Sequence, residues 1–482
     1  MMDSGGKSEK VSYPKEGEEE VENVEGKVSQ AVSDVDPLKV LEANIQAAAS
    51  KLRPTLLVDY TEPEPGPSHV QTGGAPGSES GELGAPGAGS LWAHQAVMQP
   101  GEVSDSNEPI AHDELSFLGT EAGELPAGLM WCYDMGSGAA ISRTMVEEIH
   151  LLLRDNYVQD SSSTFQLEYT ANQINWVLGQ GEDNAVVVGI KSSGTDPDDL
   201  IGEGQLVGFV AAVPAKISIH GQTIKVGLVN FLCVHRLLRD RRLTPLLLAE
   251  IMRRLNARGI RHASFTTSSI LPLQAVADSQ YFHFPINVMT LGSLGFIEDD
   301  PLAMPINKVI DRWESHERND MFHPLTTPHI SSALTLVSDY LQKFAIKQVF
   351  DVETFTKMFG NKSGVVRTYV REKDGVVTDL ISYYVVYLKK LGTTKSQIHN
   401  EIQCAHALVN VATSMSLIDL MKVAIVHAKD DGCDVYNLLN IMDNQGIVRD
   451  MDFVEGTGTL AYFLYNWRCP KMRPDQVGLV LP

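Results

Sequence analysis

The sequence predicts an α/β protein made of two halves that repeat one order of helices and strands around a mixed sheet. Apolar runs with strand composition alternate with amphipathic helical segments along residues 142–267 and again along residues 331–467. In each half, consecutive strands are followed by a passage from a strand into a helix. A connection rich in proline and charge, residues 299–328, separates the halves. We therefore expect the fold to derive from duplication of one unit.

Residues 1–90 have the composition of a disordered tail. Residues 16–25 form an acidic run, and residues 62–90 are rich in Gly, Pro, Ser and Glu. Such segments bury too little apolar surface to offset the entropy of ordering. A short helix is expected within the tail at residues 38–52, and ordered structure is expected to begin near residues 91–92.

The first half is expected to begin with a helix at residues 142–156. Ser142 can cap this helix, and Met145, Ile149 and Leu152 recur on one face. The same reasoning predicts the other elements of this half: a helix at 172–178, strands at 185–190, 206–213 and 224–234, a helix from residue 243, and a strand at 262–267.

The second half is expected to repeat this order. Its predicted elements are helices at 331–344 and 352–359, strands at 365–371, 376–387 and 405–411, a helix at 416–429, and strands at 434–437 and 460–467.

Composition limits the function classes. The 482 residues carry a formal net charge of −22, which argues against a nucleic-acid-binding surface. The five cysteines have no CxxC spacing, and no apolar run approaches the roughly 18 residues that a membrane helix needs. No metal-ligand spacing, GxGxxG or P-loop is present, so we expect neither a metal nor a prosthetic group. We expect a cytoplasmic monomer.

The most informative segment is residues 229–254, VNFLCVHRLLRDRRLTPLLLAEIMRR. It passes from an apolar strand through a basic stretch into a strong helix former. Backbone N–H groups at such a turn and the helix dipole favour an anion, and Arg239, Arg241 and Arg242 suit a phosphate. The alternative is a solvated basic turn between two core elements.

The C-terminal residues 477–482 are apolar, which is unusual for a chain end. A terminus ending in this way is expected to pack inside and to carry the carboxylate of Pro482 with it. A buried carboxylate is unfavourable unless it is paired, hydrogen-bonded or used. The alternative is a surface strand whose last residue lies in water.

Over roughly residues 91–482 the chain resembles the myristoyl-CoA:protein N-myristoyltransferases. The resemblance rests on NFLCVHRLLRDRRLTP (230–245), FLYNWRCP (463–470) and VGLVLP (477–482), with support from ELPAGLMW (124–131), LLLRDNYVQD (151–160) and LVGFVAAVPAKI (206–217). It implies two tandem acetyltransferase-like (GNAT) units with pseudo-two-fold symmetry around a saddle-shaped sheet. Residues 91–298 would bind myristoyl-CoA, and residues 299–482 would bind the peptide and supply the catalytic C-terminus.

The resemblance also implies an activity, the transfer of a C14 acyl group from myristoyl-CoA to the N-terminal glycine amine of proteins or peptides. Backbone amides of Phe231 and Leu232 would form the oxyanion hole, and the carboxylate of Pro482 would be the general base, assisted by Thr266. Thr266 has the alternative of being an ordinary strand threonine. Coenzyme contacts would come from Leu91, Trp92, Phe231, Leu232, Cys233, Val234, Arg239, Asp240, Arg241, Arg242, Leu243 and Thr244.

The peptide side departs most from the family pattern. The residues that the resemblance assigns to it are Tyr157, Asp160, Phe165, His283 and Asn410. Asp160 is the one acid left in a segment where the family has an acidic cluster, and Gly456-Thr457-Gly458 lacks the family's carboxylate. His283 has the alternative of being a core residue. We expect a transferase with altered preference for basic residues after the glycine; the alternative is a non-catalytic relative that binds acyl-CoA or peptide.

Overall fold

The computed structural model describes residues 92, 95–110, 121–133, 141–157, 164–181, 183–194, 201–297, 310, 313, 321–392 and 400–482. The predicted tail at 1–90, with its helix at 38–52, lies outside the described residues, as do Leu91 and Asp160.

The first half contains the predicted elements and several that the sequence did not reveal. Its elements are β1 (Leu129–Cys132), α4 (Arg143–Asn156), β2 (Phe165–Glu168), α5 (Ala171–Leu178), β3 (Val186–Ser192), β4 (Leu206–Ile219), β5 (Gln222–Val234), the 3-10 helix η2 (Arg236–Arg241), α6 (Leu243–Ala257), β6 (His262–Thr267), β7 (Ala277–Pro285) and α7 (Val288–Ser293). Strands β1, β2 and β7 and helix α7 were not predicted.

The second half repeats the central part of this order and has further short elements of its own. Its elements are β8 (His323–Pro324), η5 (Thr327–His329), α9 (Ile330–Leu341), β9 (Ile346–Val349), α10 (Val352–Phe359), β10 (Val366–Lys373), β11 (Val376–Lys390), β12 (Glu401–Ala407), β13 (Val411–Ala412), α11 (Leu417–Asp430), β14 (Val435–Leu439), α12 (Asn444–Asp450), β15 (Val454–Tyr465), η6 (Pro474–Gln476) and β16 (Val477–Gly478).

In the described part of the chain, all sixteen strands join one mixed sheet with the main order β1-β3-β4-β5-β6-β15-β7-β14-β12-β11-β10-β8. Each half supplies an antiparallel meander, β3-β4-β5 or β10-β11-β12, then a helix, then a strand parallel to the last strand of the meander. Helix α6 packs on β3 and β4, whereas α9 and α11 pack on β11. This repetition confirms the duplicated α/β fold.

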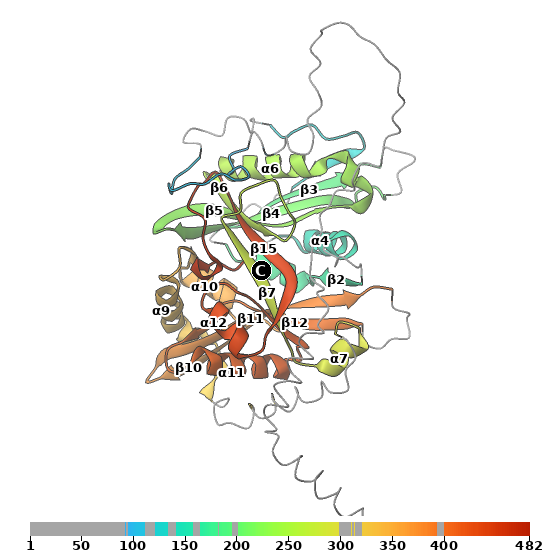
Figure 1. Ribbon diagram of the computed structural model, residues 1–482. Coiled ribbons are helices and arrows are strands. Elements are labelled where there is room, and N and C mark those ends of the chain that lie inside the picture. The colour runs from blue at the N-terminus through green and yellow to red at the C-terminus, as the bar shows by residue number, and fades with distance from the viewer. Residues whose placement is uncertain are drawn as a thin grey trace, which may run out of the picture.

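The halves exchange strands around a pseudo-two-fold axis. Strand β15 of the second half lies between β6 and β7 of the first, and β7 pairs in turn with β14. Strand β2 of the first half pairs with β11, and its counterpart β9 pairs with β4. Figure 1 shows β15 and β7 running through the middle of the molecule, where the chain also ends. Neither half can therefore complete its sheet alone.

Local sequence explains where the principal helices begin. The Ser142 hydroxyl accepts a hydrogen bond from the Met145 amide at 3.2 Å, and Ser416 does the same for Asp419 at 3.1 Å at the start of α11. Thr170 and Gln173 form a capping box at the start of α5.

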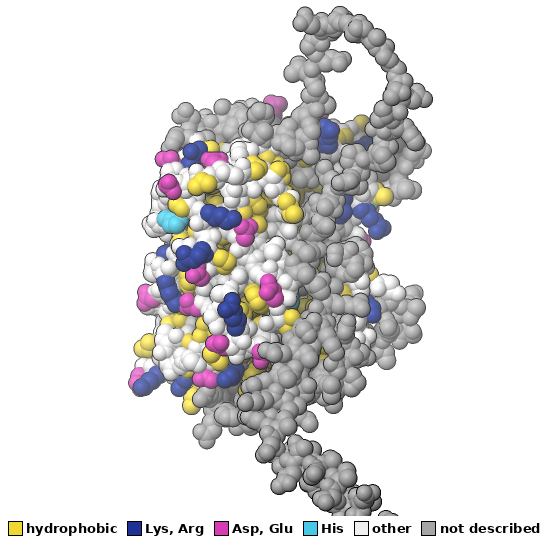
Figure 2. All heavy atoms as spheres, viewed as in Figure 1, with side chains coloured by type: hydrophobic (Ala, Val, Ile, Leu, Met, Phe, Trp, Pro, Cys, Tyr) yellow, Lys and Arg dark blue, Asp and Glu magenta, His cyan; other side chains and the backbone are white. Residues whose placement is uncertain are grey.

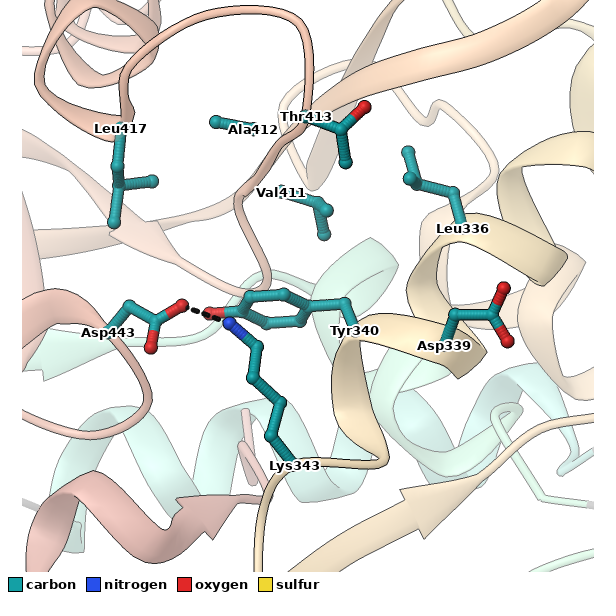
Figure 3. Close-up of a pocket in the computed structure, with 9 residues that line it drawn as sticks. All are labelled: Leu336, Asp339, Tyr340, Lys343, Val411, Ala412, Thr413, Leu417 and Asp443. Carbon is teal, nitrogen blue, oxygen red and sulfur yellow. Dashed lines mark hydrogen bonds and ion pairs between the residues drawn. The ribbon is translucent and has the colours of Figure 1, made fainter.

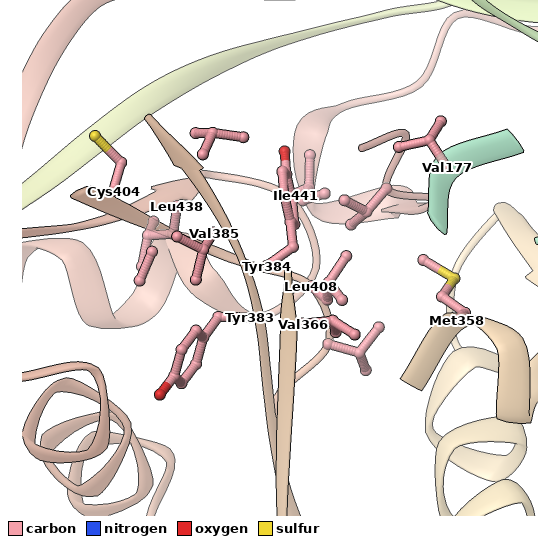
Figure 4. Packing of buried hydrophobic residues seen from close by; sticks show 14 of the residues in the cluster. Val177, Met358, Val366, Tyr383, Tyr384, Val385, Cys404, Leu408, Leu438 and Ile441 are labelled. Atoms are coloured by element: carbon pink, nitrogen blue, oxygen red, sulfur yellow. The ribbon is translucent and has the colours of Figure 1, made fainter. Parts of the chain in front are cut away.

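One hydrophobic core crosses the boundary between the halves. The indole of Trp176 on α5 donates to the carbonyl oxygen of Met358 at 3.3 Å, and its ring lies 5.7 Å from that of Tyr384 on β11. Figure 4 shows Val177 beside Met358 and the buried side chains of the second meander. Because these contacts link α5 to α10 and β11, we expect the two halves to fold as one unit.

The predicted strand at residues 405–411 is wrong in its bounds. Strand β12 begins earlier, at Glu401, and ends at Ala407, where the chain turns and the Leu408 amide donates to the carbonyl oxygen of Ser382. Val411 and Ala412 then pair separately with β11 as β13. The apolar composition of 408–411 reflects burial in this turn, which composition cannot distinguish from a strand.

Among the described residues, no helix is both long enough and apolar enough to cross a membrane. Figure 2 shows basic and acidic side chains interspersed over the described surface on the viewed side.

Candidate active site

The end of β5 contains a β-bulge at Phe231 and Leu232. On the neighbouring strand β4, Ala211 pairs with Asn230 and Phe209 pairs with Cys233. Phe231 and Leu232 lie between these two pairs, so together they face the single position 210 of β4. Phe231 has a φ of 58°, in the left-handed region that non-glycine residues rarely adopt. Its ring is 3% exposed and lies against those of Tyr157 and Tyr169 at 6.3 and 5.1 Å. The bulge thus redirects the backbone at the point where oxyanion donors were predicted.

The basic turn after β5 is held to the end of helix α4. The Arg236 amide donates to Asn156 Oδ1 at 2.9 Å, and Arg239 Nη2 donates to the Asn156 carbonyl oxygen at 2.7 Å. Arg241 and Arg242 are exposed. The turn is therefore fixed by its backbone and by one arginine, while two further guanidinium groups face solvent.

Helix α6 begins with an uncapped first turn. Its N-cap, Arg242, has a φ of 53° and makes no side-chain capping hydrogen bond. Leu243 is buried in the core and Thr244 is half-buried. Amides at such a helix start favour an anion, so the geometry suits the predicted phosphate site.

Trp92 lies beside the same region. Its ring stacks on that of Phe265 at 6.5 Å, which in turn stacks on Phe463 at 5.1 Å. These rings pack against the hydrophobic cluster that contains Val234 and Leu243. The structure thus brings Trp92, Val234 and the start of α6 together.

Cys233 cannot act as a nucleophile in this setting. Its side chain is fully buried, and burial raises the pKa of the thiol to about 12. A protonated thiol is inert, so Cys233 can contribute only apolar surface to the predicted contacts with the acyl-CoA.

The C-terminal segment packs inside the molecule. Val477 and Gly478 pair with β9, Leu479 is fully buried, and Pro482 is half-buried. The Tyr462 hydroxyl donates to the Leu479 carbonyl oxygen at 3.1 Å. Tyr462 also stands opposite Thr266 in the β15–β6 pairing. Tyr462 therefore adjoins both Thr266 and the C-terminal segment, the two places where catalytic groups were predicted.

Four tyrosines gather between the bulge and the C-terminal segment, and the sequence did not predict this cluster. They are Tyr169, Tyr281, Tyr384 and Tyr462. Burial raises the pKa of the Tyr384 hydroxyl, and its three neighbours raise it further; burial also raises the pKa of Tyr281 to about 12. All four hydroxyls therefore stay protonated at neutral pH and can donate hydrogen bonds.

His283 belongs to a buried polar chain. Its Nδ1 lies 2.7 Å from Asn437 Oδ1, and Asn437 Nδ2 lies 3.0 Å from His406 Nε2. Burial lowers the pKa of both histidines, that of His406 to about 3. A Cβ added at Gly456 would stand 2.3 Å from His283 Nε2, so a residue without a side chain is required there. Both histidines are therefore neutral, and His406 stacks on Tyr384 at 5.2 Å.

The other predicted peptide residues have different surroundings. The Tyr157 ring lies 6.1 Å from Tyr169 at the cluster. Phe165 is 1% exposed and packs edge-on against Phe296 at 5.7 Å. Asn410 is buried, and its Oδ1 accepts from the Ser382 amide at 3.2 Å. The structure brings Tyr157 to the tyrosine cluster, whereas the contacts of Phe165 and Asn410 lie in the core.

A separate hollow of about 360 Å³ opens on the second half. It lies between α9, strand β13 and the start of α11, where the Lys343 ammonium pairs with Asp443 at 2.6 Å (Figure 3). This is the position in the second half that corresponds to the basic turn of the first.

Comparison with known protein families identifies the chain. The N-terminal domain of myristoyl-CoA:protein N-myristoyltransferase matches residues 111–277, and the C-terminal domain of that enzyme matches residues 304–480. The chain therefore belongs to the myristoyl-CoA:protein N-myristoyltransferase family, which confirms the resemblance seen in its motifs.

Individual relatives agree with this assignment. Glycylpeptide N-tetradecanoyltransferase of Drosophila melanogaster is 31% identical over 399 residues, covering 81% of this chain and 80% of the relative. The Plasmodium falciparum enzyme of that name is 32% identical over 399 residues, covering 81% and 93%. The crystal structure of Saccharomyces cerevisiae N-myristoyltransferase with bound myristoyl-CoA aligns with a TM-score of 0.70 and 25% identity, covering 80% of this chain and 93% of that one.

Proposed function

We propose that this protein transfers a myristoyl group from myristoyl-CoA to the N-terminal glycine amine of protein substrates. The observation that carries the proposal is the bulge at Phe231, which leads directly into the basic turn and the uncapped helix α6. Family membership supports the same assignment, and a relative from yeast was crystallised with myristoyl-CoA.

The acyl donor is proposed to bind in the first half. Arg239, Arg241, Arg242 and the amides at the start of α6 would hold the coenzyme phosphates, with Trp92 beside them. The acyl chain would lie against the apolar side of the bulge, where Cys233 and Val234 are buried. Myristoyl-CoA is a substrate in this scheme, not a resident cofactor.

The chemical step begins with the glycine ammonium, whose pKa of about 8 leaves it mostly protonated at neutral pH. The carboxylate of Pro482 takes one proton, and Thr266 positions the resulting amine. The amine nitrogen then attacks the thioester carbonyl carbon, a C–N bond forms, and the electron pair moves to the carbonyl oxygen. The amides of Phe231 and Leu232 stabilise that oxyanion, and such a donor contributes about 3 kcal/mol.

Collapse of the tetrahedral intermediate breaks the C–S bond. Coenzyme A leaves as a thiolate and takes up a proton, while the amide nitrogen loses its second proton. The protonated hydroxyls of Tyr169 and Tyr281, two members of the tyrosine cluster, would donate hydrogen bonds to the peptide backbone. The described cysteines form no disulfide bond, which agrees with the cytoplasmic setting that we propose.

The test is an acyl-transfer assay with myristoyl-CoA and N-terminal-glycine peptides that vary the basic residues after the glycine. Matched peptides with N-terminal alanine are the control. We expect a mass increase of one myristoyl group on glycine peptides alone, with little dependence on a downstream lysine. Coenzyme binding without transfer to any peptide would instead support the non-catalytic alternative.

A further inference from the structure

The outer edge of the second half brings together three side chains that commonly bind metal ions. They are His323 on β8, His329 on η5 and Glu372 on β10, and one ligand atom from each lies within 4.8 Å of the other two. His329 Nε2 is 3.4 Å from Glu372 Oε2, and the two imidazole rings are 4.8 Å apart between centroids. We propose that these residues bind a divalent transition-metal ion, with Zn²⁺ the best match.

The ligand set determines this choice of metal. Two imidazole nitrogens and one carboxylate oxygen suit Zn²⁺, which binds such atoms at about 2.0–2.2 Å. Tetrahedral ligands at that distance lie about 3.4 Å apart, so His329 and Glu372 already have suitable spacing. The ligand atom of His323 lies within 4.8 Å of the other two, so it needs a shift of about 1.4 Å at most. With three protein ligands, the fourth position is left to water, as in open zinc sites.

The backbone fixes the segment that carries both histidines. His323 pairs with Val370 in the β8–β10 ladder, and the Leu325 amide donates to the carbonyl oxygen of Thr368 at 2.8 Å. On the opposite strand, Glu372 adjoins a bulge in β10. Bulges re-aim side chains, and this one stands where the carboxylate meets the histidines.

Thr326 controls the orientation of His329. The Thr326 hydroxyl lies 3.1 Å from His329 Nδ1, and the Thr326 amide donates to that nitrogen at 3.2 Å. Metal binding at Nε2 requires a proton on Nδ1, which would then donate to the hydroxyl. Once Nδ1 carries a proton, it can no longer accept the hydrogen bond from the Thr326 amide. Because metal binding costs this hydrogen bond, we expect an affinity for the metal in the micromolar range.

The proposed metal site is remote from the proposed reaction centre. Eight inter-strand steps separate β5 from β8 in the sheet, which is roughly 38 Å along the sheet at about 4.8 Å per step. A metal here would fasten the two-residue edge strand β8 to β10. Sequence spacing did not reveal the site because Glu372 comes from a different strand.

Isothermal titration of the chelator-treated full-length protein with zinc chloride tests the proposal. We expect saturable binding of about one Zn²⁺, weakened at least 10-fold in His323→Ala and in His329→Ala, and weakened in Glu372→Gln. His220→Asn, which changes an exposed histidine elsewhere, should bind as the wild type does. Acyl transfer and far-ultraviolet circular dichroism should be unchanged in all four variants.

A second titration uses Co²⁺, whose visible absorption reports the coordination geometry. Intense d–d bands that vanish in the His323→Ala/His329→Ala double variant would support a site with these ligands. The proposal is overturned if wild-type protein shows no saturable binding below about 100 µM, or if the double variant binds as tightly as the wild type.

Discussion

The two halves share a passage from an antiparallel meander through a turn into a helix. The two turns differ in their basic residues and in whether a side chain caps the helix that follows. In the first half the turn carries exposed arginines, and helix α6 starts without a side-chain cap. In the second half residues 408–416 contain no lysine or arginine, and Ser416 caps α11. The turn of the first half is therefore open to an external anion, whereas the turn of the second half is closed to one.

A carboxylate of the chain itself closes the second turn. Asp379 on β11 is fully buried, and its Oδ1 accepts from the amides of Thr413 and Ser414, each at 2.9 Å. Its Oδ2 accepts from the hydroxyls of Thr378 and Ser414. In the first half, no side chain caps the corresponding helix. Duplication therefore produced two potential anion sites, and Asp379 fills one of them.

The largest expected effect tests which half supplies the base. Adding two glycines after Pro482 moves the terminal carboxylate away, and loss of a general base lowers the rate about 10²–10⁴-fold. Binding of myristoyl-CoA in the first half should change less than about threefold. Single-turnover transfer and calorimetry measure the two quantities. Pro482→Ala, which keeps a free terminal carboxylate, is the matched control and should retain most activity; undiminished transfer in the extended variant would exclude this base.

Removing the internal anion should destabilise the second half. Asp379→Ala leaves two amides and two hydroxyls without their acceptor, and we expect a loss of about 3–4 kcal/mol in the free energy of unfolding. Urea unfolding followed by circular dichroism measures it. The exposed Asp450→Ala should stay within about 0.5 kcal/mol of the wild type. Equal stability of the two variants would mean that the closed turn does not need its carboxylate.

The arginines of the open turn should matter for the coenzyme alone. In the Arg241→Gln/Arg242→Gln variant we expect the Kd for coenzyme A to rise about 10–30-fold, because each lost phosphate contact contributes about 1 kcal/mol. Lys343→Ala removes a cation at the corresponding place in the second half and should leave this Kd unchanged. Titration calorimetry at two salt concentrations distinguishes lost phosphate contacts from misfolding. If phosphate contacts are lost, the affinity of the wild type for coenzyme A should fall more steeply with salt than that of the variant.

The elements that the sequence predicted well are those whose signals are local. The Ser142 cap and a one-sided apolar face located α4, and the strand–turn–helix motif located the basic turn. Local signals cannot show that β15 enters between β6 and β7, because that pairing joins residues far apart in the chain.

The unpredicted parts of the candidate site follow from the exchange of strands between the halves. Tyr462 on β15 reaches Tyr281 and Tyr384 only after the halves interlock. The same holds for His283 and His406, which meet through Asn437. Likewise, β8 meets β10 only in the folded sheet, so no spacing pattern linked His323 to Glu372.

The smallest effect concerns the helices that follow the two turns, α6 and α11. Helix α6 buries Glu250, whose carboxylate pairs with two arginines at 2.7 and 2.6 Å. Helix α11 carries the half-buried His427, whose Nε2 is itself buried and has no hydrogen-bond partner among the described residues. Burial lowers the pKa of His427 to about 4. The unfolded chain therefore takes up this proton first, near pH 6.5, and the folded protein loses stability as the pH falls from there towards 4.

His427→Gln should remove this dependence. Between pH 6.5 and 4 we expect the free energy of unfolding of the wild type to fall more steeply than that of the variant, by up to about 1.4 kcal/mol per pH unit. Above pH 7 the pH dependence of the two proteins should be alike. His220→Asn controls for loss of an exposed histidine and should keep the wild-type slope. Parallel curves for wild type and His427→Gln would show that the acid sensitivity comes from other groups. The functional difference between the halves would then be limited to the two turns and would not extend to helices α6 and α11.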